Sequence, residues 1–349
     1  MKILFGVFEL GLGHATRCTP LIQMLLSKKH EVHIISTGRS LNILKETFKE
    51  RCVYHDIPGI HSFYNSNFFK TNFAIHINSI LKSLKKARIE SKLLISKEKF
   101  DLVISDCRYD IFDKVENSFL INHQLRLMAP MGCEMIIEKY LNSMMNNYCK
   151  IIVPDFETNS LSGRLSHGLR YIDKDKIDYI GILSSVKKLN LKQDIDIFIS
   201  LSGPEKTRLK LERKIISEAP SLNGKIVIAG GNPDKRETKK QDNITYYSYL
   251  KNKEQENLMN RAKFLVIRSG YTTLMELAEL NKKALLIPSP GQTEQEYLGA
   301  YLEKKKYFHH VNQSRISLAK DITIAKKFNG FIPPWNTNES LKKFMKVVF

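Results

Sequence analysis

The sequence predicts an α/β protein built from two Rossmann-like domains, each with a parallel sheet. The chain has 349 residues, more than a single hydrophobic core usually serves, so about two domains are expected. Short β-branched runs alternate with helical stretches in the first half, and the alternation restarts in the second half. This order indicates βαβ units, whose strands pair in parallel. We therefore expect two βαβ halves with a cleft between them.

Six apolar runs in the first half have the length of buried strands. They span residues 3–8, 32–36, 52–55, 102–105, 119–121 and 151–153. Apolar residues spaced three and four apart indicate helices between the strands. Pro20 leaves the start of the first helix open, because Thr19 is a candidate N-cap with Pro20 in the first turn.

Five further runs in the second half predict a second set of strands. They span residues 195–200, 225–229, 244–246, 264–267 and 284–287. A polar stretch from 173 to 193, broken by an apolar run at 179–183, separates the two sets. We place the boundary near Ser184, which gives an N-terminal domain of residues 1–183 and a C-terminal domain of residues 184–349. The tail at 340–349 has a helical pattern.

The composition excludes several classes of protein. Hydrophobic residues make up 42% of the chain and charged residues 26%, which is ordinary for a globular protein and excludes large-scale disorder. No apolar run approaches the roughly 20 residues that a membrane-spanning helix needs. The N-terminus briefly resembles a signal peptide, but Glu9 interrupts the apolar run and a glycine-rich loop follows. We interpret the run as the first strand and expect a cytoplasmic protein.

The cysteines and the charge balance bear on metals and partners. The five cysteines form no C-x-x-C pair, which argues for reduced thiols and against a disulfide framework or a zinc site. The net charge of +19 suggests an anionic partner. Residues 63–100 carry eight lysines and arginines against two glutamates, after a run of aromatic residues. This pattern fits contact with an anionic membrane or a phosphate-bearing acceptor, or equally a solvated helix face beside packed aromatics.

A glycine-rich motif, Gly11-Leu12-Gly13-His14-Ala15-Thr16-Arg17, follows the first strand directly. Glycines let the backbone approach a bulky group, and the helix start beyond them offers free amides to a phosphate. The third glycine of a dinucleotide fingerprint is absent and no G-K-[ST] follows, so neither NAD nor a Walker loop is expected. His14 falls at the carboxyl edge of the sheet, where open α/β folds bind ligands. The ordinary alternative is a surface histidine that caps the next turn.

Asp106 ends the fourth strand, on the same edge as His14. A carboxylate bonded to one imidazole nitrogen fixes the tautomer and raises the basicity of the other nitrogen, as a general base requires. A cap on the next helix is the ordinary alternative for Asp106 and does not exclude this role. His123 and Gln124 end the following strand on the same edge and are expected to line the acceptor cleft.

Small and hydroxyl-bearing residues follow two strands of the second half, where helix N-termini suit a diphosphate. They are Ser202, Gly203, Ser269, Gly270 and Thr272. Glu276 lies about two turns into the same helix as Thr272, where its carboxylate is placed to hold a ribose diol. Farther on, Gln292, Glu294 and Gln295 offer amide and carboxylate groups matched to sugar hydroxyls.

Residues 268–300 resemble the C-terminal donor-binding domain of family 28-type glycosyltransferases, relatives of the enzyme that adds N-acetylglucosamine to the peptidoglycan lipid precursor. The Gly-Leu-Gly-His-x-x-Arg start and the strand ending in Asp106 resemble a less characterised branch, whose members are mostly known only as glycosyltransferases. The resemblance implies the GT-B fold, in which two Rossmann-like domains face each other across a cleft. It also implies a metal-independent inverting transfer, usually from a UDP-sugar, and a C-terminal helix (340–349) that packs back on the first domain.

The resemblance also assigns roles to individual residues. It places the donor at Ser202, Gly203, Ser269, Gly270, Thr272 and Glu276, with Gln292 and Gln295 near the hexose. Uracil would be held largely by backbone near Tyr249 and Leu250. The N-terminal loop differs from that of the peptidoglycan enzyme, so the acceptor is not carried over beyond the family expectation of a lipid-linked or cell-envelope molecule.

These residues together predict a single displacement at the anomeric carbon. His14, oriented by Asp106, takes the proton of the acceptor hydroxyl. Helix amides stabilise the leaving diphosphate, with Arg17, Arg208 or Arg268 as charge partners and the loop at Gly11 and Gly13 beside the acceptor. No metal or other cofactor is expected, because the D-x-D pairs at 173–175 and 194–196 are interpreted as surface residues.

Two other functions compete with this one. Nucleotide-sugar hydrolases of the pseudaminic acid pathway share the fold and the G-x-G-H-x-x-R start, and would use His14 to activate water. Fast cleavage of the donor without an acceptor would favour them. A basic nucleic-acid-binding protein would show strongly salt-dependent binding, but no nucleic-acid motif is present and no nucleic-acid partner is expected.

Overall fold

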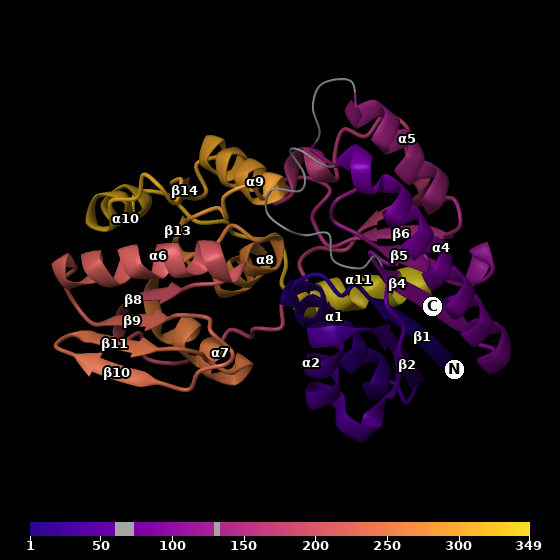
Figure 1. Cartoon of the computed structure of the whole chain (residues 1–349), viewed down its shortest axis with the longest axis horizontal. Helices are drawn as coiled ribbons and strands as arrows, with labels where there is room; N and C mark the ends of the chain where they lie inside the picture. The colour runs from indigo at the N-terminus through magenta and orange to yellow at the C-terminus, as the bar shows by residue number, and fades with distance from the viewer. Residues whose placement is uncertain (60–72, 129–132) are drawn as a thin grey trace. The chain divides into compact units, whose positions relative to one another are not determined.

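The computed structural model describes residues 1–59, 73–128 and 133–349. The chain divides into two compact units. Unit 1 contains Met1–Ser185 and Pro334–Phe349, and unit 2 contains Val186–Pro333. Each unit has one seven-stranded sheet flanked by helices (Figure 1). In the described part of the chain, no helix is both long enough and apolar enough to span a membrane.

The sheet of unit 1 has the strand order β3-β2-β1-β4-β5-β6-β7, and every neighbouring pair is parallel. Its strands are β1 (Lys2–Val7), β2 (Glu31–Ser36), β3 (Val53–Asp56), β4 (Leu102–Asp106), β5 (Ser118–Ile121), β6 (Lys150–Val153) and β7 (Ile177–Tyr179). The six predicted strands are confirmed to within one residue at either end. β7 escaped prediction because it has only three residues and lies in the polar stretch assigned to the interdomain region.

The described helices of unit 1 include four that alternate with strands and one at the end of the chain. They are α1 (Leu12–Ser27), α2 (Gly38–Phe48), α4 (Phe73–Glu98), α5 (Cys133–Met145) and α11 (Thr337–Val348). The expected N-cap at Thr19 is wrong, because α1 begins directly after Gly11 and Pro20 lies inside the helix. The loss of one backbone hydrogen bond at Pro20 is tolerated because Cys18, Leu21 and other side chains around it are buried in the core. The helix N-terminus therefore coincides with the glycine motif.

The end of the chain belongs to unit 1. Trp335 Nε1 donates a hydrogen bond of 3.0 Å to the carbonyl of Ile180, and Phe344 on α11 is fully buried. Gly181 has a φ of +92°, and a Cβ at this position would overlap the Trp335 indole. The backbone after β7 therefore requires glycine where the terminal segment packs.

The sheet of unit 2 has the order β10-β11-β9-β8-β12-β13-β14, parallel except for the edge strand β10. Its strands are β8 (Ile195–Ser200), β9 (Ile226–Ala229), β10 (Thr238–Gln241), β11 (Ile244–Tyr247), β12 (Ala262–Ile267), β13 (Ala284–Leu286) and β14 (His309–His310). The helices are α6 (Glu205–Glu218), α7 (Asn252–Arg261), α8 (Tyr271–Leu280), α9 (Thr293–Lys304) and α10 (Leu318–Ala325). The five predicted strands are confirmed to within two residues, whereas β10 and β14 were missed.

Parallel pairing brings the carboxyl ends of the central strands to one edge of each sheet. In unit 1, Val7 at the end of β1 pairs with Asp106 at the end of β4, which in turn pairs with Ile121 at the end of β5. In unit 2 the neighbours β8, β12 and β13 run the same way. The loops that follow these strands carry the candidate site residues of each unit.

Candidate functional site

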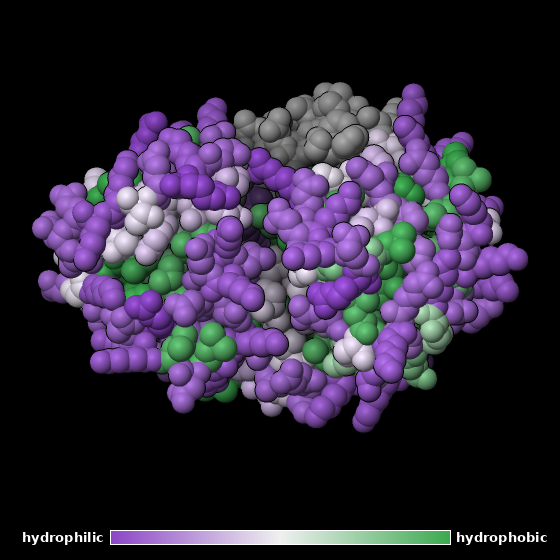
Figure 2. Space-filling model, turned by 90° about the horizontal axis from the view of Figure 1, so that it is seen from below, coloured by the Kyte–Doolittle hydropathy of each residue, from purple (hydrophilic) through white to green (hydrophobic). Residues whose placement is uncertain are grey.

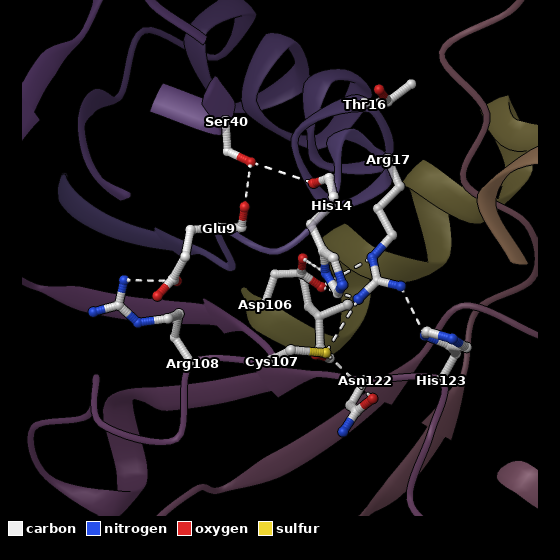
Figure 3. Close-up of polar contacts among 12 residues, drawn as sticks. Glu9, His14, Thr16, Arg17, Ser40, Asp106, Cys107, Arg108, Asn122 and His123 are labelled. Atoms are coloured by element: carbon white, nitrogen blue, oxygen red, sulfur yellow. Dashed lines mark hydrogen bonds and ion pairs between the residues drawn. The ribbon is translucent and has the colours of Figure 1, made fainter. Parts of the chain in front are cut away.

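His14 and Asp106 meet at the carboxyl edge of the first sheet. His14 lies in the first turn of α1 and Asp106 is the last residue of β4. The predicted hydrogen bond is present, with 2.7 Å between His14 Nδ1 and Asp106 Oδ2 (Figure 3). Burial opposes ionisation of Asp106, but Arg17 and His14 outweigh this effect and lower its pKa to about 2. An ionised carboxylate only accepts hydrogen bonds, so His14 carries its proton on Nδ1 and presents the lone pair of Nε2.

Arg17 occupies the other oxygen of Asp106. Its Nε lies 3.0 Å from Asp106 Oδ1, and its Nη2 donates to the same oxygen. Its Nη1 lies 2.7 Å from His123 Nδ1. A guanidinium can only donate, so His123 Nδ1 is the acceptor of this hydrogen bond. Arg17 is 1% exposed and its hydrogen bonds go to Asp106 and His123, so in the structure this side chain positions Asp106.

The pKa of His14 is below its ordinary value of 6.5. Burial is the main cause, the positive charge of Arg17 adds to it, and Asp106 opposes both. The imidazole is therefore neutral near pH 7, in the state that accepts a proton. The His14 side chain is 17% exposed, and the ring of Phe8 packs edge-on against it at 5.0 Å between centroids. The arrangement suits a general base held in one tautomer.

A second buried arginine ties together the loops around His14. Arg108 binds Asp110 through two hydrogen bonds of 2.8 and 2.7 Å and donates to the carbonyl of Ile57 at 3.1 Å. Glu9 accepts a hydrogen bond of 2.9 Å from the amide of Gly59 and lies 3.5 Å from the Arg108 guanidinium. The loops after β1, β3 and β4 are thereby connected. Sequence reasoning missed this network, although Glu9, an acid that interrupts an apolar strand, was a signal for it.

A side chain on α2 holds the loop of the glycine motif in place by hydrogen bonds. Ser40 Oγ donates to the carbonyls of Glu9 and Gly11, at 3.2 and 3.3 Å. Gly11 has a φ of +78°, and a Cβ built on it would meet no atom within 4 Å, so space is open at this point of the loop. Gly11 is exposed, and Gly13, in the first turn of α1, is half-buried. The start of α1 is therefore a rigid and accessible backbone surface.

The two polar residues predicted after β5 differ in their surroundings. The His123 side chain is buried against Arg17, so it supports the catalytic cluster. Gln124 is half-buried, and its backbone amide donates to Asn122 Oδ1 at 2.8 Å. Asn122 in turn donates to the Tyr109 hydroxyl at 2.8 Å. Gln124 is therefore the more exposed of the two residues at this edge of the sheet.

His14, Asp106 and Cys107 bring three metal-ligand types within 4.8 Å of one another, the one such group in the described part of the chain. Arg17, however, binds Asp106 Oδ1 and lies 3.3 Å from Cys107 Sγ. A metal cation bound to these ligands would face the guanidinium at close range and be repelled by it. The group therefore suits proton transfer better than metal binding.

In unit 2, Arg268 holds the loops at the carboxyl edge together. It follows β12 and donates to the carbonyls of Ser202 at 3.2 Å, Ile287 at 3.1 Å and Pro288 at 3.2 Å. Gly203, with a φ of +99°, is exposed beside Ser289, whose Oγ lies 3.1 Å from the position a Cβ on Gly203 would take. The loop after β8 thus adjoins the loop after β13.

Arg208 and Arg268, the expected charge partners of a phosphate, are both buried and bound within the protein. Arg208 is 4% exposed and donates to the carbonyl of Gly230 at 2.8 Å, with Glu212 as its acidic partner at 3.5 Å. Arg268 is 3% exposed and bound to backbone carbonyls. Both guanidiniums thus bind backbone carbonyls of the loops at the carboxyl edge of the sheet.

The candidate donor residues gather at the start of α8. Gly270 directly precedes the helix and is half-exposed, as is Thr272 in its first turn. Ser269 is buried and its hydroxyl donates to the carbonyl of Gln295 at 2.8 Å, so this hydroxyl fastens α9 to the site. Glu276 is 6% exposed; burial, with a smaller effect of Glu256, raises its pKa to about 7.

The polar residues at the start of α9 bind one another. Gln295 donates to Gln292 Oε1 and accepts a hydrogen bond of 2.9 Å from the amide of Ser289. Glu296 accepts 2.9 Å from the amide of Gly291, a contact that the sequence did not indicate. Glu294 is half-buried. These contacts order the loop between β13 and α9.

Two family models match the chain. Residues 1–129 match the family described as glycosyl transferase family 1, and residues 205–341 match the glycosyltransferase family 28 C-terminal domain. Both matched models are glycosyltransferase domains, and the two Rossmann-like units give the chain the GT-B fold. This GT-B protein is 24% identical over 337 residues to an uncharacterised glycosyltransferase of Methanosarcina mazei, a match that covers 88% of the chain and 84% of the relative.

Solved GT-B structures share the fold across the whole chain. The glycosyltransferase of kitacinnamycin has a TM-score of 0.67 at 10% identity, covering 99% of this chain and 95% of that one. MurG of Acinetobacter baumannii has a TM-score of 0.57 at 11% identity, covering 100% and 95%. At these identities the likeness concerns the fold.

Replacing Arg17 with leucine should raise the pKa of His14. The substitution removes a positive charge that lowers this pKa and leaves the attraction of Asp106. NMR titration of the His14 ring measures the pKa directly and needs no substrate. Arg39, an exposed arginine on α2, supplies the control: Arg39→Leu should leave the titration unchanged. An unmoved His14 pKa in Arg17→Leu would show that Arg17 does not set the state of the imidazole.

Proposed function

We propose that the protein is an inverting glycosyltransferase that moves a hexose or N-acetylhexosamine from a nucleotide diphosphate sugar, UDP-linked in the first instance, to an acceptor hydroxyl. The observation that carries the proposal is the His14–Asp106 hydrogen bond, which leaves His14 Nε2 as a base at the carboxyl edge of unit 1. The acceptor oxygen attacks the anomeric carbon while the bond from that carbon to the phosphate oxygen breaks. His14 Nε2 takes the proton of the acceptor hydroxyl.

The leaving diphosphate is held, in this proposal, by the open helix N-termini of unit 2. The Ser202–Gly203 loop leads into α6, and Gly270 and Thr272 open α8. Backbone amides at a helix start and the positive end of the helix dipole stabilise a developing negative charge. The mechanism needs no metal and no other cofactor, which agrees with the guanidinium of Arg17 beside the His14–Asp106–Cys107 group.

Glu276 is proposed to hold the ribose. Its buried carboxyl has a pKa of about 7, so near neutral pH the charged and uncharged forms are both populated. A ribose diol would donate two hydrogen bonds to the ionised carboxylate and favour that form. The sugar hydroxyls are assigned to Gln292, Glu294 and Gln295 at the start of α9.

The nucleotide base distinguishes two classes of donor. The resemblance to family 28 favours uracil, held by backbone near Tyr249 and Leu250 after β11. Among solved structures of the same fold, a spinosyn rhamnosyltransferase was determined with thymidine diphosphate, at 14% identity and a TM-score of 0.62. In this chain the ring of Tyr249 is covered by the guanidinium of Arg236 at 4.3 Å. The resemblance to family 28 favours UDP, and the spinosyn enzyme was determined with thymidine diphosphate. UDP and dTDP are therefore the two nucleotides to compare first.

Calorimetric titration with UDP, dTDP, GDP and ADP should show selective micromolar binding of one nucleotide, UDP in our proposal. Glu276→Ala should weaken that binding by about tenfold or more, because two hydrogen bonds to a charged group are lost. Glu279→Ala, a half-buried glutamate on the same helix, is the matched control and should bind as the wild type does. Binding of none of the four would contradict the donor assignment of unit 2.

We further propose that the acceptor is lipid-linked and that the protein acts at the inner face of the cell membrane. The outward side of α4 carries Lys82, Lys85, Lys86 and Lys92, and between them Ile89 and Leu93 are 52% and 66% exposed. A basic helix face with exposed apolar side chains suits an anionic membrane surface. The aromatic and basic residues predicted at 63–72 lie outside the described residues. On the face drawn in Figure 2, hydrophilic residues predominate, with small groups of hydrophobic residues between them.

Co-sedimentation with vesicles tests the membrane contact. Binding should require anionic lipid, and reversing Lys85, Lys86 and Lys92 to glutamate should lower it at least tenfold, since each basic residue near such a surface contributes about 1 kcal/mol. The control reverses three exposed lysines of unit 2, namely Lys320, Lys326 and Lys327. Equal binding by all three proteins, or an equal loss in both variants, would contradict a specific role of α4.

A further inference from the structure

Arg268 differs from the other buried arginines of the described chain. Each of the other four buried arginines has an acidic partner: Arg17 with Asp106, Arg108 with Asp110, Arg126 with Glu138 and Arg208 with Glu212. Arg268 is buried to the same degree, 3% exposed, but its hydrogen bonds go to neutral oxygens. Besides the three backbone carbonyls, its Nη2 donates to Gln313 Oε1 at 2.8 Å. Within the described residues, this guanidinium forms no salt bridge.

A buried charge without a counter-ion is costly, and proteins normally pair it. Burial lowers the pKa of Arg268 to about 10, so the guanidinium is still charged at neutral pH. The carbonyl dipoles around it compensate only part of the positive charge. An anion that arrives near Arg268 would therefore interact with it strongly, because the surroundings are poor in water and screening is weak.

The position of Arg268 indicates where such an anion would lie. Its contacts reach the loop after β8 through Ser202 and the loop after β13 through Pro288. Through Gln313, which donates to the carbonyl of Thr207 at 2.9 Å, they also reach the first turn of α6. Within the loop after β13, Ser289 Oγ is buried and has no hydrogen-bond partner in the described part of the chain. The charge and a free hydroxyl thus lie beneath the same group of loops.

We propose that Arg268 is a positioning residue whose unpaired charge selects a phosphate-bearing ligand, the bound diphosphate supplying the counter-charge that the fold leaves out. Arg268 acts through the loops it binds and through its electric field, without touching the ligand. This inference rests on the proposed function of unit 2 as the donor site. It goes beyond that function by assigning the recognition of phosphate charge to a side chain below the site.

The charge of the ligand separates this role from a purely structural one. Wild type, Arg268→Gln and Arg268→Lys are titrated at moderate salt with the nucleoside, the nucleoside monophosphate and the nucleoside diphosphate of the base that the wild type selects. In Arg268→Gln the affinity should fall by about tenfold for the diphosphate, by less for the monophosphate and by under twofold for the nucleoside. Arg268→Lys, which keeps the charge, should restore most of this gradient.

Arg208→Gln is the matched control, because Arg208 is the other buried arginine of unit 2 and has its own carboxylate partner. It should lower stability without producing a gradient with phosphate charge. An equal loss of affinity for all three ligands in Arg268→Gln would overturn the proposal and make Arg268 a structural residue. If Arg268→Gln fails to fold, Arg268→Lys carries the test, since an equal loss for all three ligands there contradicts the proposal as well.

A measurement of thermal stability, made without any nucleotide, adds a second test. Inorganic pyrophosphate should raise the melting temperature of the wild type and raise that of Arg268→Lys by a similar amount, but not that of Arg268→Gln. If the wild type binds no nucleotide at all, the donor-site proposal is wrong. The role proposed for Arg268 is then wrong as well, because it rests on that site. Selective nucleotide binding with no gradient in the variants leaves the donor site intact and overturns only the role of Arg268.

Discussion

The structure of unit 1 depends on a buried ion pair, Arg17 with Asp106. A carboxylate that is fully buried at the end of a strand is stable in its charged form only beside a cation. Arg17 supplies that cation to one oxygen, so the other oxygen is free to orient His14. Both partners of Asp106 come from α1, which is why the start of this helix at Gly11 matters. If α1 began at Thr19, neither side chain would be held on the rigid first turns of a helix that packs on the sheet.

The two units use buried arginines in opposite ways. In unit 1 the positive charge of Arg17 is neutralised by Asp106, and its remaining effect is to lower the pKa of His14 and keep the base neutral. In unit 2 the positive charge of Arg268 is left without a carboxylate beneath the loops proposed to receive a diphosphate. The first arrangement suits proton transfer from an acceptor hydroxyl. The second suits an anionic donor and its leaving group, so the electrostatics of the units match the two halves of a glycosyl transfer.

Much of this arrangement was predictable from sequence, for a geometric reason. Residues that end parallel strands, and those that soon follow them, share one sheet edge, so strand positions placed His14 and Asp106 near each other and made a hydrogen bond between them the expectation. The roles of the arginines did not follow, because sequence shows a charge but not its burial or its partner; Arg17 and Arg268 were both assigned to phosphates. Pro20 misled for a related reason, since tertiary packing overrode its local preference. β14, with two histidines, is too short to carry a strand pattern.

The central claim is that His14 is the base of a glycosyl transfer. The most direct measurement is the release of nucleotide from the donor that calorimetry selects, in the presence of a lipid extract as the source of acceptor, for wild type and His14→Ala. If His14 is the base, release depends on the extract and is abolished in His14→Ala, whose nucleotide affinity stays within a few-fold of the wild type. Retained turnover in His14→Ala would contradict the assignment of the base. Fast release without any extract would contradict transfer itself and indicate hydrolysis by the same residues.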